Sequence, residues 1–107
     1  MIAIIDGKRY NTETAEVIAT KSNGYFRSDF KFEVTTLYRT KKGRFFTFGE
    51  GGPMSCYAES VGGGFSGGEK LTPLDDITTV EFLETMASTG DDEAINAIEK
   101  YFSVEEA

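Results

Sequence analysis

The chain of 107 residues has 18 acidic and 11 basic residues, one cysteine and no histidine, and its formal net charge at pH 7 is −7. This length suits one domain with one hydrophobic core, and an apolar content of 39% argues against wholesale disorder. A single cysteine excludes an internal disulfide, and no apolar run approaches the roughly 20 residues of a membrane-spanning helix. We therefore expect a protein of the cytoplasm that has no contact with a membrane.

The N-terminal segment predicts three strands. Asp6-Gly7, between the apolar residues 2–5 and the segment 8–10, is typical of a two-residue hairpin turn. The β-branched residues Val17 and Ile18 favour a third strand, because branched side chains suit a pleated strand better than a helix. We expect all three strands to join one sheet.

An aromatic hairpin is predicted to organise that sheet. Apolar and polar residues alternate over 30–38, which indicates a half-exposed strand. After a basic turn at 41–44, the return strand places Phe46 and Phe48 on one face and Phe45 on the other. Aromatic side chains on both faces predict that one face meets the core and the other meets a helix or a partner.

The segment 49–68 is rich in glycine and loses the strand period, so it is predicted to be a mobile loop. Gly62, Gly64 and Gly67 have the spacing of a dinucleotide-binding loop. That motif needs a following helix to receive the pyrophosphate, whereas residues 69–74 read as a strand. We therefore do not expect phosphate binding at these glycines.

Two helices are predicted at about 75–88 and 91–102, each beginning with aspartates that can cap its first turn. The apolar stripes expected to face the sheet are Ile77, Val80, Leu83, Met86 and Ala87 on the first helix, with Phe82 at the edge of the stripe, and Ala94, Ile95, Ile98, Tyr101 and Phe102 on the second. The predicted fold is a single α+β domain over 1–107. It has an antiparallel sheet of four or five strands, drawn from about 2–48 and 69–74, with the two C-terminal helices packed on it.

Charge is distributed unevenly along the chain. Residues 1–70 carry ten basic and eight acidic residues, whereas residues 71–107 carry one lysine and ten acidic residues. The acidic face predicted to bind a partner comprises Glu81, Glu84, Asp92 and Glu93. Such a face suits a basic partner, although acidic helices also serve as a soluble surface. Direct binding of nucleic acid is not expected, because phosphate contacts need clustered Lys and Arg and the negative net charge repels phosphates.

Candidate catalytic groups are scarce. The absence of histidine removes the commonest general base and any nucleophile–histidine pair. Cys56 has no local feature that would lower its pKa, so it is predicted to be a buried structural cysteine. The acidic pairs 75–76 and 91–92 are better explained as helix caps than as metal ligands. We therefore expect no enzymatic activity, no cofactor and no metal.

Several segments resemble a family of small acidic proteins encoded by phages, plasmids and conjugative elements of Gram-positive bacteria. The resemblance covers residues 5–74 and is carried by segments 6–15, 27–30, 37–46 and 49–55, of which the stretch from Tyr-Arg-Thr to Pro-Met-Ser is the most specific. Members of this family accompany anti-restriction and anti-CRISPR genes. The resemblance thus implies an inhibitor of host defence, such as an anti-CRISPR protein directed at an RNA-guided nuclease.

The resulting hypothesis is a non-enzymatic inhibitor, acting in the bacterial cytoplasm, whose acidic surface occupies a nucleic-acid-binding groove of a basic host protein such as a CRISPR effector. A second predicted contact surface, on the hairpin and loop, comprises Tyr38, Arg39, Arg44, Phe45 and Glu50. One alternative is a regulatory or structural module of a mobile element that self-associates through the aromatic hairpin, as a monomer in equilibrium with a weak homodimer. Another is a small enzyme that holds its ligand in the glycine-rich loop.

Overall fold

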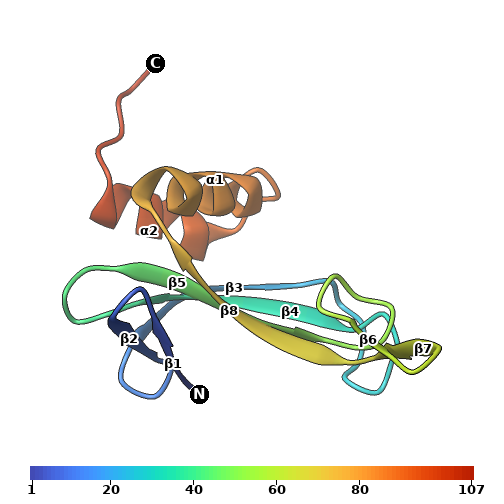
Figure 1. The fold of residues 1–107 in the computed structure, drawn as a ribbon. Coiled ribbons are helices and arrows are strands. Elements are labelled where there is room, and N and C mark those ends of the chain that lie inside the picture. The colour runs from blue at the N-terminus through green and yellow to red at the C-terminus, as the bar shows by residue number, and fades with distance from the viewer.

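A computed structural model describes all 107 residues, and its eight strands and two helices form an α+β fold (Figure 1). The strands are β1 (Ile2–Ile5), β2 (Lys8–Asn11), β3 (Glu16–Ser22), β4 (Glu33–Arg39), β5 (Phe45–Gly51), β6 (Glu59–Val61), β7 (Gly64–Ser66) and β8 (Gly68–Leu74). The helices are α1 (Asp76–Ala87) and α2 (Asp92–Tyr101).

The central sheet has four antiparallel strands in the order β3-β4-β5-β8, which confirms the predicted fold class. The β4–β5 turn is closed by Thr40, whose amide donates to the Arg44 carbonyl at 2.8 Å while its hydroxyl accepts from the Arg44 amide at 3.1 Å. Gly43 supplies the positive φ of 84° that this turn requires. Pro73 is tolerated in β8 because β8 is an edge strand, where a missing amide donor can face solvent.

The helices cover one face of this sheet. Buried Leu37 and Phe45 point toward them and pack with Leu83 and Met86 of α1. Asp75 caps α1 by accepting a hydrogen bond from the Thr78 amide at 2.8 Å. Strands β4, β5 and β8 present alternate residues to this face, and a register shift in β3 between Val17 and Ala19 lets both Ile18 and Ala19 pack there, so one helix layer covers the apolar row.

The aliphatic stripe predicted for α1 is partly wrong. The residues buried on α1 are Thr79, Leu83 and Met86, whereas Ile77 is 72% exposed and lies on the outer side. On α2 the buried residues are Ala94 and Ala97, and Ile95 is 38% exposed. The helices lie flat on a sheet whose Phe45 fills much of the space, so small residues face inward on α2 and some large ones face out.

The N-terminal hairpin covers the opposite face of the sheet, where the expectation of a single continuous sheet is wrong. Strands β1 and β2 pair only with each other and lie across the central sheet on the side away from the helices (Figure 1). Tyr10 of β2 is 6% exposed, and its ring meets that of Phe46 edge to face at 5.4 Å. Phe46, Phe48 and Leu71 present an apolar face that would otherwise meet water, and the hairpin buries it.

At the end of the sheet opposite the β4–β5 turn, the structure differs from two further expectations. Strand β4 begins at Glu33, because the Asp29 carboxylate accepts from the Lys31 amide at 2.7 Å and holds the preceding residues in a turn. The segment 49–68 is largely ordered: β5 extends to Gly51, and β6 and β7 form a hairpin. Its glycines permit close approach, since a Cβ on Gly49 would lie 1.9 Å from the ring of Tyr57.

Candidate functional site

The acidic residues predicted to bind a partner lie on the helix layer but not on one side of it: Glu81 and Glu84 lie on the outer side of α1, whereas Glu93 lies beside the sheet edge, where it lines a hollow together with residues of β3. Glu81, Glu84, Asp92 and Glu93 are all exposed, as expected. The chain has one ion pair, between Arg27 and Glu50, so none of these four carboxylates is neutralised within the molecule. The strongly acidic C-terminal third is thus displayed on two rigid helices.

An apolar strip lies within this acidic layer. Exposed Ile77 and half-buried Val80 line a shallow hollow of about 330 Å³ on the outer side of α1, and the other lining residues are Asp76, Glu81 and Glu84. These positions recur every three or four residues, which places them on one helical face. An exposed apolar centre bordered by charge is typical of a protein-binding surface.

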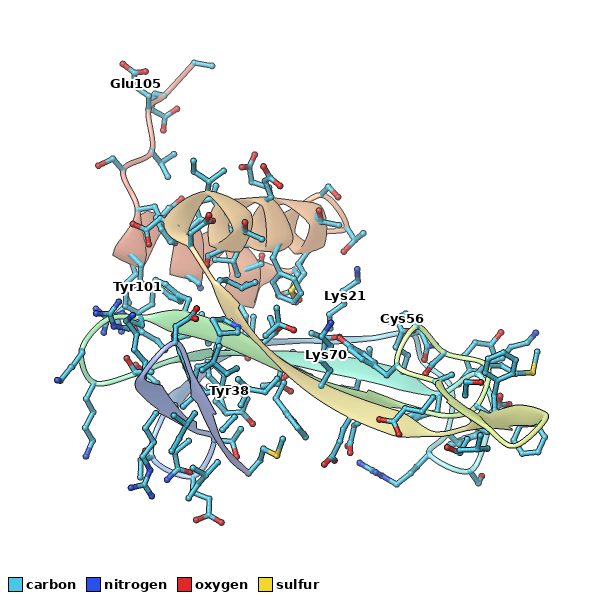
Figure 2. The ribbon with its side chains drawn as sticks, in the orientation of Figure 1. Lys21, Tyr38, Cys56, Lys70, Tyr101 and Glu105 are labelled. Atoms are coloured by element: carbon cyan, nitrogen blue, oxygen red, sulfur yellow. The ribbon has the colours of Figure 1, made fainter.

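The residues predicted for the hairpin surface do not form one site. Phe45 is 5% exposed and packs against Tyr101 and Phe102, so its predicted contact with a partner is corrected to a core role. The Arg39 guanidinium lies 4.7 Å from the centre of the ring of Tyr101, the last residue of α2, which points toward the sheet (Figure 2). Tyr38 is half-buried.

The remaining residues of that predicted surface lie apart from one another in the structure. The Tyr38 ring stacks on Phe46 on the other face of the sheet, with centroids 5.0 Å apart. Glu50 lies near the opposite end of β5, where it pairs with Arg27 at 2.6 Å. Arg44 alone is exposed, at the hairpin turn. Strand alternation sends neighbouring residues to opposite faces, and a segment that is continuous in sequence is therefore divided in space.

Cys56 lies beside a cavity of about 310 Å³ between the sheet and α1, and it is exposed, which corrects the expectation of a buried cysteine. Its amide donates to the Glu33 carboxylate at 2.8 Å, and this hydrogen bond lowers the pKa of Glu33. Partial burial, followed by the nearby Glu33 carboxylate, raises the pKa of the Cys56 thiol. The thiol is thus kept protonated at neutral pH and is a poor nucleophile.

The distal end of the molecule exposes aromatic side chains. Phe26 is 86%, Phe30 65% and Phe65 67% exposed. Phe30 is held next to the glycine-rich segment because its carbonyl accepts from the Met54 amide at 2.8 Å. The dinucleotide-like glycines lie around the β6–β7 hairpin and are followed by β8, so no helix N-terminus faces them.

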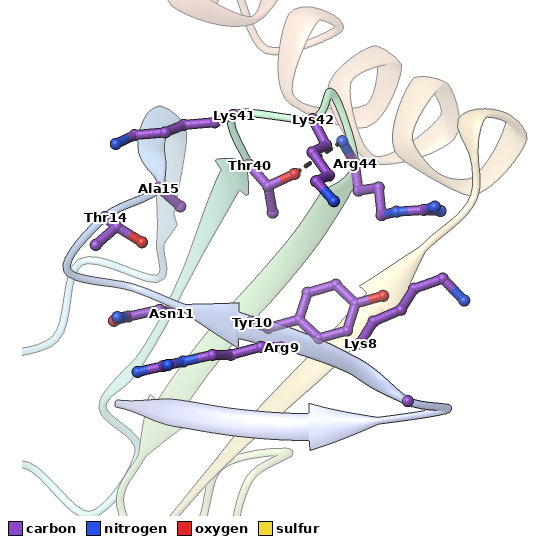
Figure 3. Close-up of a pocket in the computed structure, with 11 residues that line it drawn as sticks. Lys8, Arg9, Tyr10, Asn11, Thr14, Ala15, Thr40, Lys41, Lys42 and Arg44 are labelled. Carbon is purple, nitrogen blue, oxygen red and sulfur yellow. Dashed lines mark hydrogen bonds between the residues drawn. The ribbon is translucent and has the colours of Figure 1, made fainter.

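A basic cavity of about 390 Å³ lies at the other end of the sheet, between β2 and the β4–β5 turn (Figure 3). The cations that line it are Lys8, Arg9, Lys41, Lys42 and Arg44, and no acidic side chain lines it. Sequence reasoning noted the basic turn but missed the cavity. Residues 8–9 and 41–44 are far apart in the chain, and only the packing of the N-terminal hairpin on the sheet brings them together.

No metal-binding cluster is formed, since no three His, Cys, Asp or Glu side chains converge. Neither helix has the length and apolar character needed to cross a membrane. Comparison with known proteins finds no matching family model, no matching curated sequence and no matching solved structure. The surfaces of the molecule itself therefore carry the functional inference.

Proposed function

We propose that this chain is a non-catalytic inhibitor whose acidic helix layer binds a basic protein on a surface that normally receives nucleic acid. The observation that supports this proposal is the outer side of α1, where Ile77 and Val80 lie among unpaired carboxylates. The resemblance to proteins of mobile elements in Gram-positive bacteria supplies the candidate target, an RNA-guided nuclease of host defence.

Two physical features favour binding through this layer. Glu81 and Glu84 stand three residues apart on one helix, where like charges repel, and a cationic partner would relieve that repulsion. Exposed Ile77 would add apolar burial at the centre of the contact. Charge would then supply long-range attraction and selectivity, and the apolar centre would slow dissociation.

The test is binding to a guide-loaded RNA-guided nuclease from a Gram-positive host, together with inhibition of its DNA cleavage. Replacing Glu81, Glu84, Asp92 and Glu93 by their amides should weaken binding at least tenfold, and wild-type binding should weaken as salt rises. A matched control neutralises four exposed carboxylates outside the helices, those of Glu13, Glu59, Glu69 and Glu106.

The control should bind like the wild type, because it changes the net charge equally but leaves the helix layer intact. If both variants weaken binding equally, the effect is one of net charge and the assigned surface is wrong. If the wild-type chain neither binds nor inhibits such nucleases, the proposed function fails.

Self-association is a second candidate function, but the surface that would mediate it is not the hairpin surface predicted from the sequence. Burial of Phe45 removes the exposed aromatic patch from the hairpin. The exposed side chains Phe26, Phe30 and Phe65 at the distal end are the ones that could pair two copies.

A further inference from the structure

The basic cavity stands out because the chain as a whole is acidic. Five cations line it, from the N-terminal hairpin and from the β4–β5 turn, in a protein whose net charge is −7. The only ion pair of the molecule lies elsewhere, between Arg27 and Glu50. The acidic residues next to the lining segments in sequence, Asp6, Glu13 and Glu16, do not line the cavity. Like charges held together without counterions favour an anionic ligand.

The cations sit on a rigid frame. Tyr10, between Arg9 and Asn11, is wedged over Phe46 and is 6% exposed, so β2 is anchored to the sheet. On the other side of the cavity, the two hydrogen bonds of Thr40 close the turn that carries Lys41 and Lys42 (Figure 3). The backbone that carries the cations is therefore held in place, whereas the exposed Lys and Arg side chains would lose rotamer freedom when a ligand binds.

We infer that this cavity binds the sugar–phosphate backbone of a nucleic acid. The lining is basic and polar, and its only apolar members are Tyr10 and Ala15. Because the Tyr10 ring is buried against Phe46, no aromatic face is offered for stacking a base, and recognition would not depend on base sequence. Tight protein interfaces are usually anchored by aromatic or apolar side chains in pockets, and this cavity offers little apolar surface for such an anchor from an acidic peptide.

The negative charge of the helices does not cancel the positive charge of this cavity. The central sheet lies between the helix layer and the N-terminal hairpin (Figure 1). Solvent-exposed charges more than about 8 Å apart are largely screened at physiological salt, so the helix carboxylates on the opposite side of the sheet act only weakly on the cavity. The expectation that this chain avoids nucleic acid rested on a lack of clustered Lys and Arg and on the repulsive net charge. The fold creates such a cluster, while the net charge of −7 remains.

This inference is independent of the proposed inhibitor function, and a different experiment tests it. Fluorescence anisotropy would follow a labelled single-stranded DNA of roughly 20 nucleotides as the purified chain is added. If five phosphates are neutralised, log affinity should fall with log salt at a slope of about −3.5, which is about 100-fold between about 50 and about 200 mM salt.

The triple variant Lys41→Gln, Lys42→Gln, Arg44→Gln should weaken binding at low salt by at least tenfold and reduce that slope by about 2. The matched control replaces three exposed lysines elsewhere, Lys21, Lys31 and Lys70, by Gln. Circular dichroism establishes that both variants fold.

The variant neutralised at Glu81, Glu84, Asp92 and Glu93 should retain DNA binding, which separates this site from the helix layer.

Three outcomes would overturn the inference. The wild type could fail to bind DNA at low salt, or the control could lose as much affinity as the triple variant. A poly-glutamate peptide of equal charge could also bind more tightly than the DNA, which would assign the cavity to acidic proteins instead.

Discussion

Phe46 and Ile77 provide the sharpest test of the packing, because the sequence pattern places Ile77 on the core stripe and leaves the face of Phe46 open, whereas the structure buries Phe46 and exposes Ile77. Phe46 is fully buried between the N-terminal hairpin and the sheet, in contact with Tyr10 at 5.4 Å and Tyr38 at 5.0 Å between ring centroids. Phe46→Ala should therefore lower the free energy of unfolding by about 3–5 kcal/mol, through lost burial, a cavity and two lost aromatic contacts. Ile77→Ala should change it by less than about 0.5 kcal/mol, because that side chain is 72% exposed.

Urea unfolding followed by far-UV circular dichroism and tyrosine fluorescence would measure both values. With a slope of about 2 kcal/mol per molar urea, Phe46→Ala should lower the midpoint by about 2 M. Hydrogen exchange should show the amides of β2 losing protection first, because Tyr10 loses its packing partner. The reasoning is refuted if Phe46→Ala costs less than about 1 kcal/mol, or if Ile77→Ala costs as much as Phe46→Ala.

Two further predictions concern the glycine-rich segment and the first helix. Gly49→Ala should destabilise by about 1–3 kcal/mol in thermal denaturation, because its Cβ would displace Tyr57 from its hydrogen bond with Thr35. Gly62→Ala, where nothing lies within 4 Å, is the control and should have little effect. The Thr78 amide lowers the pKa of Asp75 below its ordinary value of 3.8, so this cap stabilises the fold above that value and loses its effect as pH falls through the lower folded pKa. In urea unfolding across this range Asp75→Asn should remove that part of the pH dependence, and parallel curves for the two proteins would contradict the assignment.

Local patterns in the sequence were sufficient for the secondary structure near the strongest signals. Asp6-Gly7 adopts positive φ at both residues and closes a hairpin, as that dipeptide predicts. Asp75 and Asp91 cap the two helices, because each carboxylate reaches an amide three residues ahead. These features depend on neighbours within a few residues, which a single sequence contains.

Misassigned segments were those in which distant residues compete with local pattern. Phe30 continues the period of β4, yet the Asp29 turn and the adjacent Gly52 hold it outside the strand. The glycines of 49–68 suggested mobility, whereas they let Tyr57 and the 29–32 turn approach the backbone of β5. The sequence shows where a glycine leaves space for close approach, but only the tertiary structure shows which residue occupies that space.

The two candidate sites differ in the same respect: one was predictable from the local sequence and the other was not. The acidic layer was predictable, because the charges of a helical segment stay together on one element and point away from its buried face. The basic cavity was not, because Lys8 and Lys41 come to line one cavity only when the N-terminal hairpin packs across the sheet. Which face of the sheet that hairpin covers, and hence which charges meet, depends on burial of Phe46 by Tyr10, a contact between residues far apart in the chain.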